Sequence, residues 1–172
     1  METVAYTGPH QGLVDWLASN GIDYAVHEHR LSFTARETAN AEGVDPQSFA
    51  KVVCVTADEG RRVMFVLKAT DHLDLRKVRD VLGAKAARLM TEDDLARLAP
   101  GCDVGAIPAV GDLFGVPLYA DHAIRDDAEI SFNAGTHHHS VRVERRAWET
   151  AARVIYADLA EDWDRRPAWI RS

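Results

Sequence analysis

Apolar residues in this chain follow two spacings, one typical of helices and one typical of strands. Residues 13–17 place apolar side chains on one helical face, and the stretch ends at Asn20-Gly21, a favourable left-handed exit from a helix. Thr34 begins a Thr-x-x-Glu capping box, in which the hydroxyl and the carboxylate satisfy free amides at a helix start. Helices are expected over residues 10–20, 34–42, 75–82, 91–98 and 148–163.

Other stretches alternate apolar and polar residues or are rich in β-branched residues, as strands are. Residues 50–55 and 62–67 flank the turn cluster 58–60 and form the clearest predicted hairpin. The remaining strands are expected over residues 22–29, 86–90, 116–120, 129–133 and 140–143. Strict βαβ alternation is not seen, so the order predicts an α+β fold with a mixed, strongly curled, barrel-like β-sheet surrounded by helices.

Length and composition fit a single domain. The chain has 172 residues, 47% of them hydrophobic, and we expect one domain over residues 1–172 with its core over about 22–148. The formal net charge of -7 argues against a general nucleic-acid coating protein, because such binding depends on neutralising phosphates. The two cysteines are too few for a disulfide scaffold, and no apolar run reaches the roughly 20 residues of a membrane helix. A cytoplasmic protein without a membrane partner is expected.

Three separated stretches carry features that a plain core strand would lack. Lys51 lies within the apolar run 49–55, and an internal lysine must reach the surface or pair with an anion. The loop 105–111 and the stretch 132–137 carry glycines, which let backbone amides approach a ligand closely. An outward-pointing lysine and a plain tight loop are the structural alternatives. If the three stretches converge, they line one pocket.

The histidine run 137–139 raises the question of a metal site. In a strand, alternation sends His137 and His139 to one face and His138 to the other. Zinc needs three or four ligands and no other Cys/His spacing completes the set, so neither a metal nor another cofactor is expected.

Cys102 would need an electropositive setting to act as a nucleophile, whereas the neighbouring Asp103 raises the pKa of the thiol. Serine-hydrolase, P-loop and dinucleotide motifs do not occur in the sequence.

The three stretches, in this order and spacing, resemble the YbaK/ProX family, the free-standing relatives of the editing domain inserted in bacterial prolyl-tRNA synthetases. The resemblance runs from about residue 22 to residue 148. Its motifs are a His-containing first strand, Thr34 to Ala39, Lys51, Gly105-Ala106-Ile107-Pro108, Tyr119-Ala120-Asp121 and Phe132 to His137. The family usually has proline at the fourth position after the first loop glycine, where this chain has Ala109. This departure concerns amino-acid specificity more than the fold.

The resemblance implies a trans-editing aminoacyl-tRNA deacylase, which hydrolyses the ester between a wrong amino acid and the 3′ end of tRNA. It implies that Lys51 anchors the terminal nucleotide or fixes the pocket backbone. It gives the catalytic backbone role, holding the scissile carbonyl or a water, to Gly105, Ala106 and Ile107. The substrate-binding residues that it implies are Thr34, Pro108, Gly135, Thr136 and His137. An aminoacyl ester is already activated, so oriented amides in a water-excluded site can suffice without a protein nucleophile.

An acidic protein needs a local basic surface to bind tRNA. Arg76, Lys77 and Arg79 lie on one predicted helix, and Lys85 and Arg88 follow it. We expect these residues to form a track for the phosphates of the acceptor stem. A solvated helix face is the alternative.

Two other functions fit the sequence. One is a non-catalytic module that binds aminoacyl-tRNA or a nucleotide-like ligand, and the other is a metal-dependent hydrolase that uses His137, His139 and either His27 or His29. Replacement of Lys51 by Ala abolishes turnover in the deacylase, and chelator-resistant turnover excludes the metal enzyme. The sequence leaves open the amino acid, the tRNA, a synthetase partner and the oligomeric state.

Overall fold

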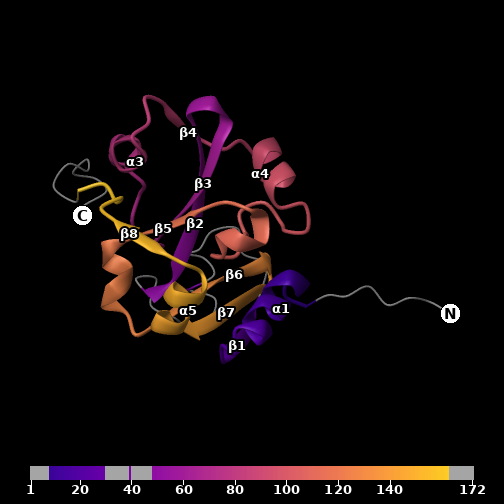
Figure 1. Ribbon diagram of the computed structural model, residues 1–172. Coiled ribbons are helices and arrows are strands. Elements are labelled where there is room, and N and C mark those ends of the chain that lie inside the picture. Colours follow the sequence, from indigo (N-terminus) through magenta and orange to yellow (C-terminus); the bar gives the residue numbers. More distant parts are fainter. Residues whose placement is uncertain (1–7, 30–38, 40–47, 163–172) are drawn as a thin grey trace.

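A computed structural model of the chain describes residues 8–29, 39 and 48–162. The described strands form a three-stranded sheet with the order β1-β7-β6 and a five-stranded sheet with the order β4-β2-β3-β5-β8 (Figure 1). The strands are β1 (Tyr24–Glu28), β2 (Ala50–Ala57), β3 (Arg61–Lys68), β4 (Ala87–Leu89), β5 (Leu118–Asp121), β6 (Glu129–Thr136), β7 (His139–Glu144) and β8 (Ile155–Ala157). The helices are α1 (Gln11–Ser19), α3 (Leu75–Leu82), α4 (Glu92–Leu98) and α5 (Arg145–Ala151).

Figure 1 shows the long β2–β3 hairpin standing between α3 and α4, with the three-stranded sheet, α1 and α5 gathered at its lower end. The pairs β3–β5 and β5–β8 are parallel, and the other named pairs are antiparallel. The α+β class with mixed pairing is therefore confirmed. None of the described helices is long and apolar enough to cross a membrane.

The expectation of one strongly curled, barrel-like sheet is not supported. Among the described residues, the two sheets are linked by an isolated parallel bridge between Phe49, just before β2, and Ser131 of β6. A barrel needs a ladder that continues from strand to strand around the closure. Here β2 turns away from β6 after one bridged pair and continues in the other sheet, so both sheets stay open.

Local signals explain the helix boundaries. Asp74 caps α3 by accepting from two amides, and Gly83 ends the helix in the left-handed region with φ of 63°. Thr91 and Asp94 form a reciprocal capping box at the start of α4. The predicted helices 10–20, 75–82 and 91–98 are confirmed. The predicted helix 34–42 lies, apart from residue 39, outside the described residues.

Two expected elements are wrong. The predicted helix 148–163 ends early as α5, because Arg153 adopts a left-handed φ of 54° and the Val154 amide closes the turn on the Glu149 carbonyl at 3.0 Å. The chain then forms β8, which pairs with β5. The expected alternation of the histidine run also fails, because His137 and His138 form the turn between β6 and β7 and are not strand residues.

The buried apolar residues form two main clusters on opposite faces of the β2–β3 pair. One cluster joins these strands to α1, α5 and the apolar face of the three-stranded sheet, and includes Cys54, Met64, Val66, Leu13, Leu17, Phe132 and Trp148. The other packs against α3 and includes Val55, Val63, Phe65, Leu67, Val78 and Leu82. Alternation along β2 decides the cluster to which each residue belongs.

Candidate functional site

Two of the three predicted stretches are joined directly by backbone hydrogen bonds. The Gly135 amide donates to the Ala106 carbonyl at 2.8 Å, and the Asp103 amide donates to the Gly135 carbonyl at 2.8 Å. The Asp103 carboxylate adds a third link by accepting from the His137 amide at 3.1 Å. The loop that follows Asp103 is therefore fixed against the end of β6, as expected from the sequence.

Close approach explains the glycine in β6. Gly135 has φ of 92°, a conformation that side-chain-bearing residues rarely adopt, and a Cβ there would lie 2.5 Å from the Cβ of His10. The His10 amide donates to the Ala134 carbonyl at 2.7 Å, which holds the start of α1 against the same strand. No sequence pattern singles out His10, because its contact with Gly135 is purely tertiary.

The predicted loop amides differ in their availability. The Ala106 amide donates to the Asp103 carbonyl at 3.0 Å, so it is already engaged. The amides of Gly105 and Ile107 make no hydrogen bond with any other described residue. Ile107 is buried and Gly105 is exposed with φ of 86°. Of the three predicted donors, the Gly105 and Ile107 amides are therefore without a partner among the described residues, while Ala106 supplies its carbonyl to the link with Gly135.

The second half of the loop is anchored by α5. The indole of Trp148, which is fully buried, donates to the Ala109 carbonyl at 2.7 Å. The Val110 amide donates to the Pro108 carbonyl at 2.9 Å, and Pro108 itself is buried. Trp148 of α5 thus holds the loop backbone at Ala109, the position where the YbaK/ProX family usually has proline. No local sequence signal connects Trp148 with this loop.

Lys51 lies in β2 close to β6 and is half-buried. The Phe49–Ser131 bridge brings the start of β2, two residues before Lys51, beside β6. The Lys51 ammonium lies 3.5 Å from the Ala69 carbonyl at the end of β3. The amine therefore does not extend into open solvent.

A small cavity lies between the loop and β2. It has a volume of about 170 Å³, and the described residues that line it are Val52, Val53, Cys54, Leu89, Met90, Leu95, Gly105 and Ile107. Lys51 is not among these described lining residues, although it directly precedes them in β2. The predicted convergence is thus seen for the two glycine-bearing stretches. It is not seen for the lysine, because alternation along β2 puts the Lys51 side chain on the strand face opposite to Cys54.

Both cysteines are held as neutral thiols. Burial raises the pKa of Cys54, which lines the cavity, to about 12. Burial and then the charge of Asp103 raise the pKa of Cys102 to about 11. A thiolate nucleophile near neutral pH is therefore disfavoured at either position, in agreement with the interpretation of Cys102 from the sequence.

The histidines at the β6–β7 turn take part in local hydrogen bonds. The Thr136 hydroxyl and Nδ1 of His139 lie 2.7 Å apart, and the His138 amide donates to the same hydroxyl at 3.1 Å. Burial lowers the pKa of His139 and favours its neutral form. Within the described part of the chain, no three His, Cys, Asp or Glu side chains are grouped so that they could hold a metal ion.

Two of the residues predicted to bind tRNA phosphates, Arg76 and Lys77, already form ion pairs with carboxylates of the protein. The Lys77 ammonium lies 2.8 Å from carboxylate oxygens of both Asp158 and Asp162. Arg76 pairs with Asp74 at 3.5 Å. Lys77 therefore joins α3 to the segment after β8. Thr34, the predicted binding residue near the first stretch, lies outside the described residues.

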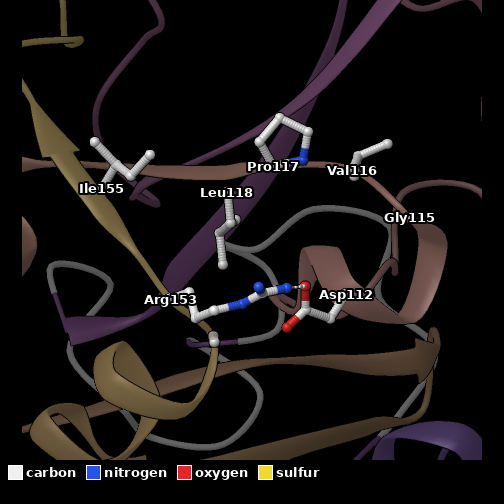
Figure 2. A pocket seen from close by; sticks show the side chains of 8 residues that line it. Asp112, Gly115, Val116, Pro117, Leu118, Arg153 and Ile155 are labelled. Carbon is white, nitrogen blue, oxygen red and sulfur yellow. Dashed lines mark hydrogen bonds and ion pairs between the residues drawn. The ribbon is translucent and has the colours of Figure 1, made fainter.

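A larger cavity, of about 490 Å³, opens elsewhere on the molecule. Figure 2 shows Arg153 and Asp112 joined by an ion pair beside Pro117 and Leu118, with Ile155 at the far side. None of the predicted site residues is among its described lining residues. The cavity is thus separate from the candidate site.

The comparisons with known proteins agree with this geometry. A sequence model of the aminoacyl-tRNA editing domain matches residues 29–151. The proline–tRNA ligase of Shouchella clausii is 35% identical over 128 residues, which are 73% of this chain and 22% of the ligase. The corresponding ligase of Acidithiobacillus ferrooxidans is 32% identical over 101 residues, 59% of this chain and 17% of the ligase. The chain thus spans about a fifth of the length of these curated relatives.

A solved structure shares the fold. The crystal structure of a candidate trans-editing enzyme for prolyl tRNA synthetase superposes with a TM-score of 0.79 at 22% identity. The match covers 92% of this chain and 100% of that one. This likeness shows the fold. The match of the family model over most of the sequence shows that the chain belongs to the aminoacyl-tRNA editing domain family.

Proposed function

We propose that this chain is a trans-editing deacylase that hydrolyses the ester of a mischarged tRNA without a metal ion. The observation that carries the proposal is the loop held by Asp103 and Gly135, which leaves the Gly105 and Ile107 amides available beside a small cavity. Family membership supports the reaction class. The full-length match to a candidate trans-editing enzyme supports action in trans.

The available amides are suited to stabilise charge that develops on the scissile carbonyl. Backbone donors fixed in advance do not have to reorganise during the reaction, and removal of one such donor typically costs about 10²–10³ in rate. The ester is already activated, and a ribose hydroxyl of the substrate can assist the attack. Because both cysteines are held as neutral thiols, the proposed route uses water and no thiolate intermediate.

Lys51 is proposed to bind the terminal nucleotide. Lys51 is half-buried and follows Phe49, which bridges Ser131 of β6, the strand that continues into Gly135 and Thr136. A cation in a partly buried setting interacts more strongly with a phosphate than one in bulk water. Thr34, Pro108, Thr136 and His137 remain proposed substrate contacts, and Arg76 and Arg79 remain proposed tRNA contacts.

The test is a deacylation screen with the purified chain and tRNAs that carry Ala, Cys, Ser or Pro wrongly. Release of at least one amino acid in the presence of a chelator is expected, and Lys51→Ala should reduce the rate at least a hundredfold. Lys68→Ala is the matched control, because this lysine of β3 pairs with Asp126 and Asp127 and should leave the rate nearly unchanged. Binding of every charged tRNA without any turnover would instead identify a non-catalytic module, and loss of turnover with the chelator would identify the metal enzyme.

A further inference from the structure

The carboxylate of Asp103 lies where the loop 105–111 meets the turn between β6 and β7. Its Oδ2 accepts from the His137 amide at 3.1 Å, and the Asp103 amide donates to the Gly135 carbonyl at 2.8 Å. One bond holds the side chain and the other holds the backbone of the same residue. The position of the carboxylate is therefore fixed before a substrate binds.

The negative charge of Asp103 lacks a cation within the described part of the chain, where none of the ion pairs includes this residue. Oδ1, the second carboxylate oxygen, makes no hydrogen bond with any other described residue. A carboxylate accepts several hydrogen bonds, so the bond from His137 leaves capacity for more. Asp103 is exposed, and a cationic ligand can therefore reach it from solvent.

A turn connects this carboxylate with a backbone donor. The Ala106 amide donates to the Asp103 carbonyl at 3.0 Å, so residues 103–106 form a β-turn. Gly105 is at its third position with φ of 86°, as a type II turn requires. The Gly105 amide is without a partner among the described residues. The turn thus carries a negatively charged acceptor and an N–H donor two residues apart.

An α-aminoacyl ester carries a complementary pair of groups. Its carbonyl oxygen is an acceptor, and its α-ammonium, on the carbon next to the carbonyl, is a positively charged donor. We propose that Asp103 binds the α-ammonium of the substrate while the Gly105 amide binds the ester carbonyl. This inference rests on the proposed deacylase function and names the charged group of the substrate that the turn recognises.

The location of Asp103 suits a charged group of the substrate. Gly105 and Ile107 are among the described residues that line the small cavity, whereas Asp103 is not. The ammonium bound to Asp103 therefore stays at the exposed side of the turn and keeps part of its hydration. A charge inside an apolar cavity would lose that hydration at a large cost in free energy.

The carboxylate also makes catalysis depend on the ammonium. A negative charge beside the donor amides opposes the negative charge that develops on the carbonyl oxygen in the transition state. A bound ammonium neutralises Asp103 and removes this opposition. An ester with a neutral group on the α-carbon leaves the carboxylate charged. Asp103 therefore favours esters of amino acids and disfavours other esters at the same site.

The first test compares two substrates in one variant. Asp103→Asn removes the charge but keeps an oxygen for the His137 amide, and lactyl-tRNA has a hydroxyl in place of the ammonium of alanyl-tRNA. The substitution should lower kcat/KM for alanyl-tRNA at least about tenfold, because hydrogen bonds between charged groups are the strong ones. It should raise kcat/KM for lactyl-tRNA, since the opposing charge is gone.

Asp93→Asn is the matched control, because it removes an exposed carboxylate from the first turn of α4 and should leave both values unchanged. The comparison between substrates separates recognition of the ammonium from support of the loop, since a loosened loop impairs both reactions alike. Equal effects of Asp103→Asn on the two substrates, whether a loss or none, would overturn the assignment.

The second test does not depend on turnover. The non-hydrolysable 3′-alanylamino-3′-deoxyadenosine should shift the side-chain carboxyl ¹³C resonance of Asp103 and the ¹⁵N amide resonance of Gly105. The 3′-lactylamino analogue should shift only the Gly105 amide. These shifts without hydrolysis of any aminoacyl-tRNA would refute the proposed function and retain the ammonium site. Hydrolysis of alanyl-tRNA together with an unshifted Asp103 carboxyl would overturn the ammonium site and leave the deacylase function in place.

Discussion

At the scale of single residues, position 135 needs glycine for two reasons: its backbone conformation is left-handed, and there is no space for a side chain. Its φ of 92° and the 2.5 Å that would separate an added Cβ from His10 both oppose substitution. We expect Gly135→Ala to lower the free energy of unfolding by about 3 kcal/mol or more, measured by urea denaturation. Gly60→Ala should cost only about 1 kcal/mol, because Gly60 has φ of 75° but no atom within 4 Å of such a Cβ.

A second substitution, at His10, separates the steric clash of a side chain at position 135 from the strain of the backbone conformation there. His10→Gly removes the Cβ that a side chain at Gly135 would meet, and glycine is tolerated at a helix N-cap at a cost of a few tenths of a kcal/mol. The double variant with His10→Gly should therefore recover part of the stability lost in Gly135→Ala. The double variant with His10→Ala keeps the Cβ and should recover none. Equal stabilities of the two double variants would contradict the contact.

Sequence patterns predicted some site residues and not others for a physical reason. Lys51, Gly105 and Gly135 are unusual residues for their local pattern, so the sequence alone singles them out. Asp103 and His10 are ordinary loop and cap residues whose roles arise from hydrogen bonds with β6. The engagement of the Ala106 amide also follows from a turn geometry that composition does not determine. A residue that is unusual for its local pattern can be recognised from the sequence, whereas the hydrogen-bond partner of a backbone amide usually cannot.

At the scale of elements, α5 acts on the loop through one indole. Trp148→Phe leaves the buried Ala109 carbonyl without its 2.7 Å donor, which should cost about 1–3 kcal/mol of unfolding free energy. Because this carbonyl fixes the loop, kcat for deacylation should fall more than KM changes. Trp16→Phe is the control, since the Trp16 indole of α1 makes no hydrogen bond with another described residue. A similar fall in kcat in both variants would contradict the role of α5.

The start of α4 should be sensitive to acid. The hydrogen bond from Arg88, followed by those from Thr91, holds the pKa of Asp94 well below its usual range. A lowered folded-state pKa contributes stability that is present above the unfolded pKa of about 4 and is lost as the pH falls through the folded value. The stability difference between the native chain and Asp94→Asn should therefore be larger at pH 6 than at pH 2.5, as measured by urea denaturation. A difference that does not change with pH would refute this.

The elements that the sequence predicted are those with strong local signals. The predicted helices 75–82 and 91–98 and the β2–β3 hairpin are confirmed, and the structure adds the left-handed Gly83 and the capping box at Thr91 that bound these helices. The strand β8 was missed because its three residues depend on pairing with β5. The end of α5 was missed because the left-handed residue after it is Arg153, and an arginine does not signal a left-handed position as a glycine does. Short parallel edge strands gain their stability from tertiary partners, so a helical pattern of apolar residues can mislead there.

At the scale of the whole molecule, the two open sheets determine which parts of the site can meet. The bridge at Phe49 brings β2 beside β6, and β2 then continues in the other sheet, where it lines a small cavity together with Gly105 and Ile107. A continuous barrel would instead keep β2 paired with β6. The mixed α+β class followed from the order of elements, but the break between the sheets depends on one long-range contact, which the order does not reveal.

Because the net charge is -7, the proposed tRNA binding must rely on selected basic residues. Lys77 is a poor candidate, because its ammonium is bound by Asp158, Asp162 and the Ala160 carbonyl. Burial alone would lower the pKa of Lys77, but hydrogen bonds to the two carboxylates outweigh it, and the pKa lies above its ordinary value. The bound lysine therefore serves the fold. Lys77→Ala should lower stability without altering the salt dependence of tRNA affinity.

Arg76 and Arg79 provide the contrast within the same helix. Arg76 is exposed, and its pairing with Asp74 at 3.5 Å is of the surface kind that contributes little. If either arginine contacts a tRNA phosphate, its replacement by Ala should reduce the slope of log K against log salt concentration by about 0.7–0.9. Filter binding between roughly 50 and 300 mM salt measures the slope for all three variants. A reduced slope in Lys77→Ala and unchanged slopes in both arginine variants would reverse the assignment and move the tRNA contact to Lys77.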